Sequence, residues 1–139
     1  MRVLVTGPES SGTSLVSRIF RAAGADVAHR SATYRNDWAD LPALAAACDE
    51  TVVVYRDPMA TLRSGVRQGL YYADALDRLH DGYRNIADLF TLRRVRVWCV
   101  TYEQLVLDQD SIRPLLYILG LDGGVEFELV TNQNAQHAQ

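Results

Sequence analysis

The sequence predicts an α/β fold, a three-layer sandwich in which helices flank a small central parallel sheet. Short β-rich runs at residues 2–6, 51–55 and 95–100 alternate with amphipathic stretches. The run at 51–55 is almost entirely β-branched, as in a strand that is covered on both faces. Alternation of strands and helices is typical of parallel sheets, because a crossover helix separates each pair of parallel strands.

The expected helices follow from apolar periodicity and from turn residues. Leu15, Ile19 and Phe20 share one face of a helix that Gly24 ends. Asp57-Pro58 opens another, with a capping carboxylate and a proline in the first turn. Residues 25–37 show no clear pattern. The helices expected from these signals are at about 13–23, 41–48, from 58 onward, and at 73–92, 102–107 and 111–119.

Length and composition fit one domain at 1–130 with a polar tail at 131–139. Of the 139 residues, 48% are hydrophobic, which is enough to build a core. The first apolar run is too short for a secretory signal, and no run approaches the roughly 20 residues of a membrane helix. We therefore expect a cytoplasmic protein without a membrane partner. Cys48 and Cys99 are expected to be buried, reduced thiols, and their spacing predicts no metal site.

The charge pattern restricts the ligands. A net charge of −3 gives no overall basic field, so we expect no nucleic-acid partner and assign any anion to a local cluster. All 14 basic residues are arginine and none is lysine, so a mechanism that needs an amine side chain has no candidate residue.

A candidate phosphate loop follows the first strand. Gly7 and Gly12 bound the loop, and Thr13 and Ser14 open the next helix. Unpaired backbone N–H groups and the helix dipole favour an anion at such a position. The spacing is that of a P-loop, with Thr13 in the place of the lysine of nucleotide kinases and ATPases.

The segment from Ser11 to Leu15, Ser-Gly-Thr-Ser-Leu, resembles the 5′-phosphosulfate loop of sulfotransferases. The resemblance implies that Ser10, Ser11, Gly12, Thr13 and Ser14 hold the 5′ end of the donor 3′-phosphoadenosine 5′-phosphosulfate. The family usually has a basic residue where this chain has Ser10.

A second motif lies at the end of the run at 51–55. Arg56-Asp57-Pro58 resembles the 3′-phosphate motif of the same family, in which a serine follows the arginine by eight residues, as Ser64 does here. An arginine at the carboxyl end of a parallel strand points into the crevice where such sheets bind ligands. We expect Arg56 and Ser64 to bind the 3′-phosphate of the donor.

A third, weaker resemblance covers residues 100–122, with Tyr102-Glu103-Gln104-Leu105 before a helix that closes in Leu119-Gly120-Leu121. Its expected role is architectural. A basic group for the transferred sulfuryl must then come from elsewhere, and Arg30 and Arg35 are the candidates. His29 is the candidate general base for the acceptor.

These motifs predict a sulfotransferase that transfers a sulfuryl group to a hydroxyl or amine of a small-molecule acceptor, without a metal. Two alternatives stay open. One is a non-catalytic nucleotide-binding P-loop protein, which Ser10 favours; the other is a degenerate kinase or NTPase with Asp57 in the place of a magnesium-binding acid. The sequence indicates neither the acceptor nor the oligomeric state.

Overall fold

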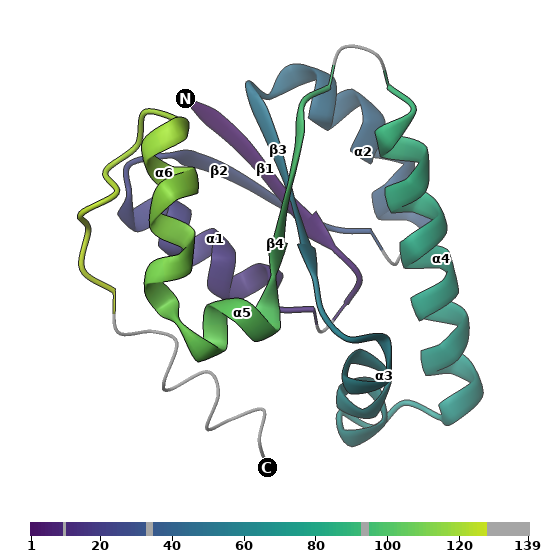
Figure 1. Ribbon diagram of the computed structural model, residues 1–139. Coiled ribbons are helices and arrows are strands. Elements are labelled where there is room, and N and C mark those ends of the chain that lie inside the picture. Colours follow the sequence, from purple (N-terminus) through teal and green to yellow (C-terminus); the bar gives the residue numbers. More distant parts are fainter. Residues whose placement is uncertain (10, 33–34, 93–94, 128–139) are drawn as a thin grey trace.

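The sheet is parallel throughout. In the computed structural model, which describes residues 1–9, 11–32, 35–92 and 95–127, the strands follow the order β2-β1-β3-β4 (Figure 1). The elements are β1 (Arg2–Gly7), α1 (Thr13–Ala22), β2 (Asp26–Ser31), α2 (Arg35–Ala47), β3 (Glu50–Tyr55), α3 (Pro58–Arg67), α4 (Tyr72–Phe90), β4 (Val97–Thr101), α5 (Tyr102–Leu107), the 3₁₀ helix η1 (Gln109–Ile112) and α6 (Arg113–Ile118). The predicted α/β class is confirmed.

Helices cover both faces of the sheet. Helices α1, α5 and α6 lie on one face, and α2 and α4 lie on the other (Figure 1). The strands serve both layers by alternation: Val3 and Val5 of β1 pack in the α1 layer, whereas Leu4 between them packs in the α2–α4 layer. This arrangement is the three-layer sandwich that the sequence predicts.

The topology brings two loops to one edge. Strands β1 and β3 are parallel neighbours, with Val5 beside Val52. The loop after β1 and the Arg56-Asp57 turn after β3 therefore leave the sheet at the same carboxyl edge, where open parallel sheets bind ligands.

Two elements differ from the sequence prediction. Strand β2 lies in the stretch without a clear pattern, because it is an edge strand whose residues are mostly half-buried on either face and so show no apolar alternation. Helix α2 begins six residues before the expected start at Leu41. It contains Pro42, a residue that helix interiors disfavour, so the pattern gave no reason to extend the helix upstream.

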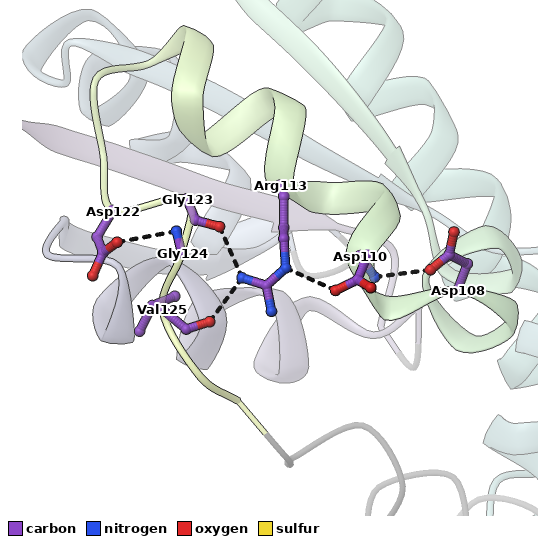
Figure 2. A network of polar contacts seen from close by, with 7 residues as sticks. All are labelled: Asp108, Asp110, Arg113, Asp122, Gly123, Gly124 and Val125. Carbon is purple, nitrogen blue, oxygen red and sulfur yellow. Dashed lines mark hydrogen bonds and ion pairs between the residues drawn. The ribbon is translucent and has the colours of Figure 1, made fainter.

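The segment after α6 is fastened to the sandwich by Arg113. Its guanidinium donates to the carbonyl oxygens of Gly123 and Val125, both at 2.8 Å, and to Asp110 at 2.7 Å (Figure 2). Its carbon Cζ lies 4.8 Å from the ring centre of Phe127, which completes the core of the α1 layer. One arginine thus holds the last described residues against α6.

Across the described ranges, no helix has the length and apolar character that crossing a membrane requires. The predicted polar tail at 131–139 lies outside the described residues.

Candidate anion-binding site at the carboxyl edge of the sheet

The loop from Gly7 to Gly12 leads into an uncapped helix. Gly12 occupies the N-cap position of α1 with φ of 98° and has no side chain to cap the first-turn N–H groups. The two glycines are needed where they stand. A Cβ on Gly7 would lie 2.6 Å from the carbonyl oxygen of Val54, and one on Gly12 would lie 2.5 Å from the Tyr102 ring. The sequence thus builds an open helix start, which is suited to an anion.

A second feature of the same loop is an unpaired hydroxyl. The hydroxyl of Ser11 is fully buried and has no hydrogen-bond partner within the described residues. Its oxygen lies beside Gly7, 2.7 Å from the position that a Cβ there would take. A buried hydroxyl normally has a partner, because desolvation without one costs free energy. Ser11 nevertheless keeps an unpaired hydroxyl at the base of the loop, as Thr6, Ser17 and Thr51 do elsewhere in the described part of the chain.

Thr13 and His29 form a pair between α1 and β2. The Nε2 atom of His29 lies 2.9 Å from the Thr13 hydroxyl oxygen. Burial lowers the pKa of His29 from its usual range, and the positive charge of Arg21 lowers it further, so the imidazole is neutral at pH 7. The predicted base candidate thus lies at the start of α1, where its ring contacts Thr13.

Arg56 reaches the loop from β3. Its guanidinium carbon lies 4.6 Å from the ring centre of Tyr102, the ring against which Gly12 packs. A Glu103 carboxylate oxygen accepts from the backbone N–H of Asp57 at 2.8 Å, and the Tyr83 hydroxyl donates to the Arg56 carbonyl at 3.2 Å. The third sequence segment is architectural, as predicted, since Tyr102 and Glu103 fix the turn that carries Arg56.

The predicted 3′-phosphate serine, Ser64, lies on α3. It is buried on α3, and its hydroxyl accepts from Gln68 at 3.4 Å within the same helix. One turn earlier, Thr61 donates to the carbonyl oxygen of Asp57 at 3.1 Å, and Asp57 itself caps Met59 at 3.1 Å. Arg56 and Gly12 thus lie against the same Tyr102 ring, and Ser64 lies two turns into α3.

The remaining predicted site residues are Arg30, Arg35, Ser10 and Ser14. Arg30 is exposed at the end of β2, next in the strand to His29 and so on the opposite face. The side chain of Arg35 lies outside the described residues, as does all of Ser10. Ser14 is exposed on the first turn of α1.

An arginine that the sequence analysis missed lies at the loop. Arg78 of α4 donates to Glu9 at 3.1 Å, with about a third of each side chain exposed. One turn later, Gly82 lets α4 approach closely, since a Cβ there would lie 3.2 Å from Pro8. The two partners are separated by 69 residues, so no local pattern could have indicated the pair.

An apolar cavity of about 370 Å³ adjoins the same edge on the α4 face of the sheet. Pro8 of the loop and Tyr55 of β3 form part of its lining, together with Tyr83, Phe90 and Cys99. The pKa of Tyr83 is raised to about 12, mainly by burial and to a smaller extent by the neighbouring Tyr55, so its hydroxyl stays protonated. Cys99 is exposed, contrary to the expectation of a buried thiol, because β4 is an edge strand.

No protein-family model, no curated protein and no solved structure matches this chain. The resemblance to sulfotransferases therefore stays a prediction, and the function has to be inferred from the residues of the site.

Proposed function

We propose that the protein transfers a sulfuryl group from 3′-phosphoadenosine 5′-phosphosulfate to the hydroxyl of a small acceptor. One observation carries the proposal: at one edge of the sheet, the glycine that starts α1 and the guanidinium of Arg56 lie against the same Tyr102 ring, and the adjoining Ser11 hydroxyl is buried without a partner among the described residues. Two anion-binding features at one edge suit a ligand with a negative group at each end. The donor has such groups in its 5′-phosphosulfate and its 3′-phosphate.

In this proposal the chain binds and orients, and forms no covalent bond to the donor. The first-turn N–H groups of α1 and the hydroxyls of Ser11 and Thr13 hold the 5′ end, and Arg56 binds the 3′-phosphate. The acceptor oxygen forms a bond to sulfur while the bond from sulfur to the bridging phosphate oxygen breaks. Adenosine 3′,5′-bisphosphate leaves, and the acceptor proton passes to solvent. In-line placement and charge stabilisation supply the catalysis, as in phosphoryl transfer.

The direct test mixes the protein with the donor and an aromatic alcohol such as 2-naphthol, and follows the sulfated product and the released bisphosphate. Release of both in equal amounts supports the proposal. Tight binding of the bisphosphate without turnover would favour a non-catalytic nucleotide-binding protein instead.

The cavity beside Pro8 and Tyr55 is the proposed acceptor site. Its lining is almost wholly apolar, and its volume is in the range of small-molecule pockets. Because Cys99 belongs to the lining, saturating 2-naphthol should slow alkylation of this thiol by about tenfold, the factor for a ligand at roughly ten times its Kd. Mass spectrometry of the alkylated protein measures the effect.

Cys48 is the internal control for this experiment. It lies outside the cavity, and burial raises the pKa of both thiols, so they react under the same alkaline conditions. Ala87→Trp fills the cavity from α4 and should abolish the protection. Equal slowing at Cys48, or protection that survives Ala87→Trp, would place the naphthol elsewhere.

The kinase or NTPase alternative has a separate test. Asp57 caps α3 through Met59, so this carboxylate is engaged in the helix rather than presented as a magnesium ligand. Thr13→Lys restores the P-loop lysine but supplies no acid, so we expect no Mg²⁺-dependent ATP hydrolysis above that of the wild type. Brisk hydrolysis by the variant in a phosphate-release assay would favour the NTPase function.

A further inference from the structure

The Thr13–His29 pair stands where a P-loop has its lysine. We infer that anion binding at the loop is coupled to protonation of His29, so that the pair supplies a positive charge only when the anion is present. The inference rests on the proposed function in one respect, namely that the loop binds the 5′ end of the donor. It assigns to His29 a positioning role through Thr13, rather than that of a base for the acceptor.

The direction of one hydrogen bond links the anion to the proton. The contact between His29 Nε2 and the Thr13 oxygen, at 2.9 Å, can be made with either atom donating. When Nε2 accepts, the Thr13 proton points at the ring and cannot be donated to a phosphate oxygen. When Nε2 donates, the Thr13 oxygen accepts and its proton is free for the anion, which can only accept. A neutral ring donates from Nε2 in only one of its two tautomers, whereas a protonated ring always donates from Nε2 and also places a positive charge next to the anion. An anion at Thr13 therefore favours a ring that donates, and the charge of the anion favours the protonated ring among those that do.

Electrostatics act in the same direction. Val5 of β1 lies beside His29, and α1 contributes Thr13 and the charge of Arg21 to this face of β2. Without a ligand, burial and Arg21 favour the neutral ring. Protonation of His29 in the free protein therefore lowers stability as the pH falls. An anion at the loop offsets the effects of burial and of Arg21 on the ring. The complex therefore binds the proton more tightly than the free protein does, and affinity for the anion rises as the pH falls.

Adenosine 5′-phosphosulfate is a suitable probe because its anionic groups hold a constant charge near neutrality. Its affinity for the wild type should increase about tenfold from about pH 8 to about pH 5.5, as for a one-unit rise in the His29 pKa on binding. Calorimetry in buffers of different ionisation enthalpy should show proton uptake. His29→Gln, whose amide can hydrogen-bond to Thr13 but does not titrate, should bind with the same affinity at both pH values. Thr13→Ser keeps the hydroxyl and should retain the pH dependence.

An NMR titration of the His29 imidazole in the wild type, with and without the probe, measures the coupling without relying on a variant. The His29 pKa should be higher in the complex. Binding that does not depend on pH, equal pH dependence in wild type and His29→Gln, or an unchanged His29 pKa would overturn this inference alone. Failure of the wild type to bind the probe or adenosine 3′,5′-bisphosphate at either pH would reject the proposed function together with the inference.

Discussion

Adenosine 3′,5′-bisphosphate is expected to bind more tightly than AMP by about 1.5–3 kcal/mol, or roughly 10- to 150-fold, and Arg56→Ala should erase this difference. The two ligands differ only in the 3′-phosphate, so the difference in binding free energy should equal the contribution of hydrogen bonds to one charged group. Arg56 is held for this contact by the Tyr102 ring and by the turn that Glu103 anchors. Calorimetry of both nucleotides with both proteins measures the effect.

Arg63→Ala is the matched control. Arg63 is exposed on α3, and replacing it with alanine removes the same charge as Arg56→Ala does. This control therefore reports the long-range effect of one cation on nucleotide binding. We expect Arg63→Ala to keep the preference for the bisphosphate almost unchanged. If AMP and the bisphosphate bind equally to the wild type, or if the two variants lose the preference equally, Arg56 is not the 3′-phosphate ligand.

The parts of the site that the sequence predicts are those with local causes. Gly12 is needed because its φ of 98° disfavours residues with a side chain, and Asp57 starts α3 by capping Met59. Each requirement leaves its mark within a few residues of the chain. The adjacency of the loop and Arg56 was also predictable, since parallel neighbouring strands end at one edge of the sheet.

The remaining features depend on contacts between distant segments. The pairing of His29 with Thr13 needs β2 to lie beside β1, and the edge position of β2 removed the alternation that would have revealed the strand. The ion pair of Arg78 with Glu9 needs α4 to cross the loop. In the sequence, Arg78 is one charge among several on an amphipathic helix, a pattern typical of any solvent-exposed helix face.

In the proposed enzyme, we expect Arg78 to supply the positive charge that Ser10 lacks. Negative charge develops on the bridging oxygen of the donor in the transition state, and losing one preorganised donor there typically costs about a hundredfold or more in turnover. We expect Arg78→Ala to lower the rate of bisphosphate release from the donor by about that factor. Arg84→Ala, an exposed arginine on the same helix, should leave the rate unchanged. Arg30→Ala and Arg35→Ala test the two basic residues that the sequence proposed for this role.

The partner of Arg78 makes the test more specific. Arg78→Ala leaves the Glu9 carboxylate without this ion pair in the loop proposed to bind the donor, so bisphosphate affinity should fall as well. In the double variant with Glu9→Gln, the repulsion is gone and affinity should recover. If Arg78 acts on the transition state, turnover stays low in the double variant, whereas a residue that only neutralises Glu9 would let turnover recover with affinity. Recovery of both turnover and affinity in the double variant would show that Arg78 only balances the charge of Glu9. Arg78 would then not be the cation that stabilises the transferred sulfuryl group.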